Sequence, residues 1–210
     1  MSIRSPEAVA RATKEMRAGH LVIVPTDTIY GIATSLTDES AIQRLYEARG
    51  REREPALPFL IADVNLMARL ARLNAPALRL AHHFWPGPLT LILPPASDLP
   101  AYARVTPVAI RVANFPSLLP ILMKTEGMLL MSGAIRSGHP PAITAEEAGS
   151  LFGESISLIL NGGPSPYGIP STIVNCILEP PAIVRHGAIS DHRIWQALGL
   201  AGQEKSHDGA

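Results

Sequence analysis

The sequence is poor in cysteine, in lysine and in long apolar runs, and each shortage narrows what the protein can be. Its one cysteine, Cys176, cannot form an internal disulfide, which excludes the disulfide scaffolds of small secreted domains. Because Cys176 lies in the apolar run Ile173 to Leu178, we expect a buried strand residue in a reducing compartment. A catalytic thiol is the less favoured alternative.

No apolar run is long enough to cross a bilayer, and no charged-then-apolar leader opens the chain. We therefore expect a soluble, cytoplasmic protein without a membrane partner. Charged residues make up only 17% of the chain, and the formal net charge is zero. Overall charge therefore gives no reason to expect nucleic-acid binding, and any basic surface must be local.

Lysine is scarce, because only Lys14, Lys124 and Lys205 among the 18 basic residues are lysines. The other basic residues are arginines, whose planar fork of N–H donors suits phosphate and carboxylate groups. A nucleotide composition bias in the source genome explains the same excess at least as well for most positions.

Several common catalytic signatures are also missing. The sequence has no GxxxxGK[ST] motif, no GxGxxG after a strand, no GxSxG elbow and no paired Cys or His spacing for a metal, so we expect no protein-bound metal. His82 and His83 are helix neighbours that point in different directions, which favours surface and packing roles. The chemistry must come from a less generic arrangement.

What the sequence does contain is an alternation of strand-like and helix-like segments. Strands are expected at 20–25, 29–33, 57–63, 89–93, 108–112, 128–131, 156–160, 172–176 and 182–185. Helices are expected near 5–18, 38–48, 63–70, 74–84 and 117–126, after a capping box at 144–147, and from 190 onward. This alternation, without a Gly- or Ser-rich linker, predicts one α/β domain over residues 1–200, and 201–210 read as a flexible tail.

Polar turns adjoin four of these strands: PTDT (25–28), RGRER (49–53), SGAIRSG (132–138) and GGPSPYGIPST (162–172). Ligands of α/β proteins bind where strand ends and loops gather. If the four turns meet in space, they form one pocket suited to a polyanion. Its candidate lining consists of hydroxyl and guanidinium groups, from Thr26, Thr28, Ser137, Ser171, Thr172, Arg49, Arg51, Arg111 and Arg185.

For each of the four turns, a purely structural role is an alternative to this hypothesis. For any single turn, Thr and Asp side chains that satisfy their own backbone are favoured by roughly two to one. The stretch Arg49 to Arg53 likewise fits a solvated surface. Only the convergence of the four turns would favour a binding site.

Several segments resemble, in order and spacing, the motifs of the YrdC family: GHLVIVPTDTIYGIA, FWPGPLTLIL, VAIRV, and STIV followed by AIVRHGAI. The resemblance runs from about residue 15 to 190. It implies a YrdC-like single α/β domain, with a strongly twisted mixed sheet, flanking helices and a concave basic surface.

The resemblance also implies an activity, that of an L-threonylcarbamoyladenylate synthase, which is a nucleotidyltransferase. Such an enzyme converts L-threonine, bicarbonate and ATP, with Mg²⁺, into threonylcarbamoyl-AMP and pyrophosphate for the threonylcarbamoyladenosine modification of tRNA. Binding of double-stranded RNA is implied as well. The chain length is similar to the short form of the family.

Roles for individual residues follow from the resemblance only. Thr26 is similar to the residue on the threonine side, and Arg51 to the second basic residue of a K-x-R motif that faces the nucleotide phosphates. Arg111 would reach the threonine carboxylate or the carbamoyl end, and Arg185 would hold the nucleotide. The adenylate site would be lined by Ser171 and Thr172.

Four positions depart from the family pattern. Arg49 replaces the lysine of K-x-R, Leu60 replaces a histidine, and Gly133 and Ile135 replace the serine and asparagine of a Ser-Ala-Asn turn. Each lost hydrogen bond to a charged ligand costs on the order of 1.5–3 kcal/mol. The alternative hypothesis is therefore a YciO-like divergent paralogue, which is non-catalytic or altered in substrate and binds double-stranded RNA or a nucleotide.

Overall fold

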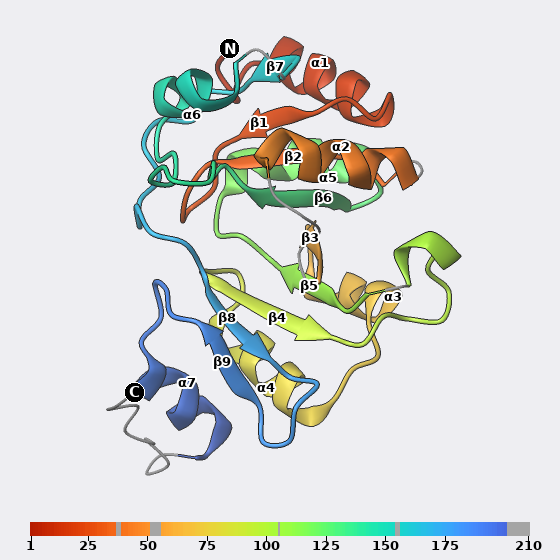
Figure 1. Cartoon of the computed structure of the whole chain (residues 1–210), viewed down its shortest axis with the longest axis vertical. Helices are drawn as coiled ribbons and strands as arrows, with labels where there is room; N and C mark the ends of the chain where they lie inside the picture. Colours follow the sequence, from red (N-terminus) through yellow and green to blue (C-terminus); the bar gives the residue numbers. More distant parts are fainter. Residues whose placement is uncertain (37–38, 51–55, 105, 154–155, 201–210) are drawn as a thin grey trace.

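The computed structural model describes residues 1–36, 39–50, 56–104, 106–153 and 156–200. Strands in these ranges form one nine-stranded sheet in the order β7-β1-β2-β6-β3-β5-β4-β8-β9 (Figure 1). The strands are β1 (Val22–Val24), β2 (Gly31–Thr34), β3 (Leu57–Ile61), β4 (Leu89–Leu93), β5 (Val108–Arg111), β6 (Met128–Gly133), β7 (Leu158–Ile159), β8 (Thr172–Asn175) and β9 (Ala182–Arg185).

The sheet is mixed. Strands β1 and β7, β3 and β5, and β4 and β8 pair in parallel, while the other neighbours are antiparallel. Figure 1 shows β1, β2 and β6 in the upper half, β4, β8 and β9 in the lower half, and the N-terminus at the end opposite α7 (Asp191–Leu198). The predicted α/β class, with a twisted mixed sheet and flanking helices, is confirmed.

Helices cover both faces of the sheet, because alternate strand residues point to opposite sides. Val22 and Val24 pack in a core with α1 and α5, whereas Ile23 packs in a second core with α2, α4, α6 and α7. The helices are α1 (Pro6–Arg17), α2 (Glu39–Arg49), α3 (Met67–Leu70), α4 (Ala75–Phe84), α5 (Leu119–Lys124), α6 (Ala145–Phe152) and α7 (Asp191–Leu198). Short 3-10 turns lie at Val64–Leu66, Ala101–Ala103 and Pro116–Leu118.

Helix starts follow the signals in the sequence. Ser5 caps α1 by accepting the Ala8 backbone N–H, and Asn74 caps α4 by accepting that of Ala77. Thr144 forms a complete capping box with Glu147 at the start of α6. These caps satisfy N–H groups that the first helical turn leaves without partners.

Several elements are shorter than predicted, among them the strands expected over 20–25, 57–63 and 156–160, and two further differences have clear local causes. The helix expected over 117–126 is a 3-10 turn followed by α5, because Pro116 and Pro120 remove backbone donors and Thr125 already leaves helical geometry. The strand expected over 29–33 begins only at Gly31. Tyr30 instead donates its N–H to the Ala142 carbonyl and accepts the N–H of Ala134.

Candidate functional site

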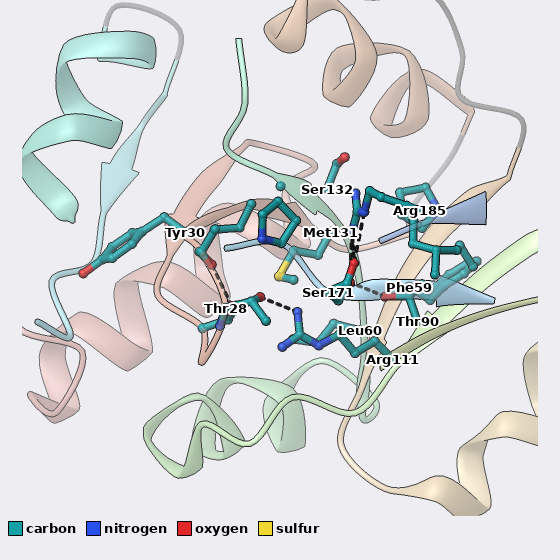
Figure 2. Close-up of a pocket in the computed structure, with 17 residues that line it drawn as sticks. Thr28, Tyr30, Phe59, Leu60, Thr90, Arg111, Met131, Ser132, Ser171 and Arg185 are labelled. Atoms are coloured by element: carbon teal, nitrogen blue, oxygen red, sulfur yellow. Dashed lines mark hydrogen bonds between the residues drawn. The ribbon is translucent and has the colours of Figure 1, made fainter. Parts of the chain in front are cut away.

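A pocket opens between the two halves of the sheet, beside the turn that follows β1 (Figure 2). Part of its lining carries hydroxyl and guanidinium groups, from Thr26, Thr28, Thr90, Arg111, Ser132, Ser171 and Arg185. The rest is mainly apolar, with Ile29, Pro58, Phe59, Leu60, Ala109, Met131, Gly133, Pro170 and Ile173. Strand ends and loops that are far apart in sequence therefore enclose one cavity.

The PTDT turn is held by its own hydroxyl groups. Thr26 Oγ1 donates to the Ile29 carbonyl at 2.6 Å and accepts the Thr28 backbone N–H at 3.2 Å. The hydroxyls of Thr26 and Thr28 lie 3.1 Å apart, and both side chains are buried. The structural role weighed for such turns is therefore real, and the same two side chains also line the pocket.

Arg111, at the end of β5, is held by hydrogen bonds on all three of its nitrogens. Its Nε donates to the Gly87 carbonyl at 3.0 Å, Nη1 donates to Thr28 Oγ1 at 2.6 Å, and Nη2 donates to Asp27 Oδ1 at 2.5 Å. Figure 2 shows the guanidinium facing Thr28. Burial lowers the pKa of Arg111 below its usual value, and the neighbouring charge of Asp27 opposes that shift.

A second polar group joins three strand ends. Arg185 Nη2 donates to the Ser171 carbonyl and to Ser171 Oγ, both at 2.9 Å, while Nε donates to the same carbonyl at 3.0 Å. The hydroxyls of Ser171 and Thr90 lie 2.7 Å apart. Ser171 thus sits between Thr90 of β4 and Arg185 of β9, as Figure 2 shows.

Glycine permits the close approach that places Ser171. A Cβ at Gly187 would lie 2.5 Å from Pro170 O, from Ser171 C and from Thr172 N. No side chain fits so close to backbone atoms, so the chain after β9 can pack there only as glycine. The motif ending in HGAI therefore supports the Ser171 side of the pocket.

Five of the nine predicted site residues line the pocket: Thr26, Thr28, Arg111, Ser171 and Arg185. Thr172 lies outside that lining, because its Oγ1 is engaged with the backbone of Ile189, donating to its carbonyl at 2.7 Å and accepting its N–H at 3.0 Å. Sequence proximity to Ser171 was misleading here, since consecutive strand residues point to opposite faces.

Ser137 and Arg49 do not line the pocket. Ser137 is exposed, in the turn that follows β6. Arg49 is the last residue of α2 and is buried, but it does not line the pocket. Arg51 lies outside the described residues, so its predicted role stays a prediction.

Residues that sequence reasoning missed are mostly on strands. Thr90 lies in β4, where LTLIL alternates buried and half-buried positions, and this alternation could have marked Thr90 as facing away from the core. Tyr30 donates its hydroxyl to the Gly163 carbonyl at 2.7 Å and accepts the Gly162 N–H, fixing the loop before β8. Burial raises the pKa of Tyr30, so the phenol keeps its proton at neutral pH.

The positions that depart from the family pattern shape the apolar side. Leu60 and Gly133 both line the pocket. A Cβ at Gly133 would lie 2.8 Å from Ile29 Cδ1 and 3.5 Å from Ile135 Cδ1, so isoleucine side chains fill the space that a larger residue would need. This wall offers apolar surface where a serine and an asparagine would offer hydrogen bonds.

Cys176 is buried just after β8, and burial raises the pKa of its thiol to about 12. A buried thiol with a raised pKa is protonated at neutral pH, which argues against the alternative of a catalytic thiolate. Among the described residues, no group of three or more His, Cys, Asp or Glu side chains could hold a metal ion. No helix within the described ranges is long and apolar enough to span a membrane.

The fold and the pocket define a class of α/β protein, in which loops from both halves of a twisted mixed sheet enclose a cavity of arginine and hydroxyl groups. The chain belongs to the Sua5/YciO/YrdC family, described as telomere recombination, whose pattern matches residues 14–187. This finding confirms the family resemblance that the sequence motifs carried.

Curated relatives come from bacteria, archaea and eukaryotes. A putative threonylcarbamoyl-AMP synthase of Mycobacterium tuberculosis is 34% identical over 196 residues, which cover 91% of this chain and 89% of the relative. A threonylcarbamoyl-AMP synthase of Pyrococcus abyssi is 32% identical over 187 residues, covering 88% of this chain. The chain spans only 55% of that second relative.

Solved structures show the same fold. The P. abyssi Sua5 complexed with L-threonine matches with a TM-score of 0.85 and 31% identity, covering 96% of this chain and 62% of that one. E. coli YciO matches with a TM-score of 0.79 and 21% identity, covering 89% of this chain and 92% of its own. At that lower identity the likeness to YciO concerns the fold alone.

Proposed function

We propose that this protein is a threonylcarbamoyl-AMP synthase, which joins L-threonine, bicarbonate and ATP into threonylcarbamoyl-AMP, with release of pyrophosphate and water. The observation that carries the proposal is the convergence of Thr26, Thr28, Arg111, Ser171 and Arg185 on one pocket. Relatives that bear the synthase name cover most of the chain, and one related structure holds L-threonine.

The chemistry of this reaction fits the side chains of the pocket. A carbamate oxygen must attack the α-phosphorus of ATP, which brings two anions together. Catalysis then depends on positioning the reactants and on neutralising their charge, and it requires no dedicated general base. Arg111 and Arg185 supply positive charge from two sides, and the threonine and serine hydroxyls supply directional hydrogen bonds.

Mg²⁺ would enter with the triphosphate, because this ion prefers phosphate oxygens and water and needs few protein carboxylates. That preference fits a pocket whose polar side chains are hydroxyls and guanidiniums. The product would serve the threonylcarbamoyladenosine modification of tRNA, with tRNA as a later partner and the cytoplasm as the compartment.

A direct test measures pyrophosphate release by the full chain in the presence of ATP, Mg²⁺, bicarbonate and L-threonine, with threonylcarbamoyl-AMP identified by mass spectrometry. We expect release that requires both L-threonine and bicarbonate. Replacing Arg185 by Met should reduce turnover by about two orders of magnitude, since a guanidinium beside a transferring phosphoryl group is removed. Arg72→Met removes an exposed arginine outside the pocket and should leave turnover unchanged.

The apolar wall of Ile29, Leu60 and Gly133 favours a second candidate function. In this alternative, the protein is a divergent YciO-like paralogue that is non-catalytic or altered in substrate, and that binds double-stranded RNA or a nucleotide. RNA binding would weaken steeply with salt through counterion release. Absence of turnover together with salt-dependent RNA affinity would favour this candidate, whereas turnover without RNA affinity would exclude it.

A further inference from the structure

Asp27 is a buried acid beside the pocket, and the proposed reaction gives it no direct role. Its exposed side-chain fraction is 3%, and its Oδ1 receives the Nη2–H of Arg111 across 84 residues of sequence. Thr28 and Arg111 are part of the pocket lining, but Asp27 is not. Asp27 therefore reaches the guanidinium from outside the cavity.

The hydrogen bonds of Arg111 use one donor on each nitrogen. Within the described part of the chain, Nε binds Gly87, Nη1 binds Thr28 and Nη2 binds Asp27. A guanidinium has five N–H groups in one plane, so one N–H on each terminal nitrogen is left over. Two donors fixed in one plane match the two oxygens of a carboxylate.

We propose that Asp27 is a positioning residue, which locks the orientation of Arg111 so that the two remaining N–H groups form a fixed donor pair for a carboxylate of the substrate. This inference rests on the proposed function for the identity of that substrate, L-threonine. Without Asp27, the guanidinium keeps its anchors at Gly87 and Thr28, but the planar group can tilt about the line through Nε and Nη1, and this tilt displaces Nη2. The substrate then has to restrict the motion of the Arg111 guanidinium when it binds, which lowers its affinity.

The burial of Asp27 and Arg111 indicates that their ion pair is a specific contact and not an incidental one. Surface ion pairs contribute little because water and salt screen them, whereas in this pair the exposed side-chain fraction is 8% for Arg111 and 3% for Asp27. A buried charge persists only when its partners are well placed. The second oxygen, Asp27 Oδ2, is buried without a hydrogen-bond partner among the described residues, so Oδ1 alone holds Arg111.

The test compares Asp27→Ala with Asp27→Asn in the full chain, and measures the affinity for L-threonine and for ATP by calorimetry. The amide oxygen of Asn can still accept the Nη2–H, whereas Ala cannot. We expect Asp27→Ala to weaken L-threonine binding about tenfold, the equivalent of one charge-assisted hydrogen bond, and to leave ATP affinity unchanged. Asp27→Asn should lose less than about threefold.

Asp63→Asn serves as the matched control, because it removes the same charge from an exposed helix cap outside the pocket. If Asp27→Ala does not fold, Asp27→Ser replaces it, since the serine hydroxyl is too short to reach Nη2. Equal L-threonine affinity in wild type and Asp27→Ala would overturn the proposal. So would a parallel loss of L-threonine and ATP affinity in Ala and Asn alike.

A second measurement needs no substrate. The guanidinium N–H signals of Arg111 in NMR spectra should show slow rotation in wild type and Asp27→Asn, and averaged rotation in Asp27→Ala. Slow rotation in all three proteins would overturn the positioning role. A wild type that binds no L-threonine but shows the expected NMR pattern would contradict the proposed function and leave the role of Asp27 intact.

Discussion

At the residue scale, positions 29 and 133 share the same space in the apolar part of the pocket. Because Ile29 Cδ1 stands 2.8 Å from where a Cβ of residue 133 would lie, a residue larger than glycine at 133 must displace the end of the Ile29 side chain. We therefore expect substitutions at the two positions to be coupled. Reverting the Ser-Ala-Asn turn without changing Ile29 would crowd the wall.

We expect Gly133→Ser alone to destabilise the protein by about 1–3 kcal/mol through overpacking. Ile29→Val frees the space, so the double variant should recover at least about 0.5 kcal/mol relative to the sum of the single changes. Urea unfolding of the four proteins measures this coupling. Additive effects would show that Ile29 does not limit position 133.

A test of whether the apolar residues limit catalysis should change positions 29 and 133 together. Adding Ile135→Asn to the Ile29→Val and Gly133→Ser double variant restores the hydroxyl and the amide that the family pattern has. If the apolar wall alone limits catalysis, this triple variant should release more pyrophosphate than wild type.

At the element scale, the connection after β9 decides where Ser171 stands. Ala188 donates its N–H to the Pro170 carbonyl, and Ile189 exchanges two hydrogen bonds with Thr172 Oγ1. Gly187 lies between these contacts and the Ser171 backbone. Residues 187–189 therefore fix the backbone at one edge of the pocket, and we call them the backbone clamp.

We predict that Gly187→Ala pushes this clamp away from Pro170 and Ser171, because its Cβ would overlap three backbone atoms. ATP affinity should fall about tenfold as Ser171 and Arg185 lose alignment, with a loss of about 1–3 kcal/mol in stability. Calorimetry and urea unfolding measure the two effects. Gly149→Ala is the control, since outside its own helix the new Cβ would meet only the end of the Ile159 side chain, at 3.3 Å, and helix propensity favours alanine over glycine.

At the scale of the whole molecule, two cores share one sheet. Met16 belongs to the core with α1 and α5, while Trp85 and Trp195 pack against the core on the other face. Strands such as β1 contribute residues to both cores. The two faces should therefore unfold as one cooperative unit.

Met16→Ala should cost about 2–5 kcal/mol, because the side chain is fully buried and leaves a cavity. Tryptophan fluorescence reports the opposite face, and circular dichroism reports the whole chain. We expect both midpoints in urea to fall together. A fluorescence midpoint that stays at the wild-type value would show that the two faces unfold independently.

Much of the fold could be predicted because its signals are local. The caps at Ser5, Asn74 and Thr144 act within three residues, and apolar periodicity marks each strand and helix. The wrongly predicted strand bounds arise where the backbone forms hydrogen bonds with residues far away in the sequence. Tyr30 leaves the strand because Ala134 and Ala142 take its backbone hydrogen bonds.

The site was harder to predict, since adjacent residues have different surroundings. Ser171 lines the pocket, whereas the neighbouring Thr172 faces the Ile189 backbone. Thr90 was not predicted because the sequence of an apolar strand does not indicate which residue contacts its threonine in the folded protein. Its partner, Ser171, is 81 residues away in sequence.

The sequence by itself determined the order of strands and helices, their caps, the family and the residue types available for anion binding. Only the tertiary structure decided that Arg111 is held by Asp27 and Thr28, that Thr172 turns away, and that two isoleucines occupy the space beside Gly133. The physical reason is the range of the interactions. Caps and periodicity act within a few residues, whereas a pocket is made by contacts between segments that only the folded sheet brings together.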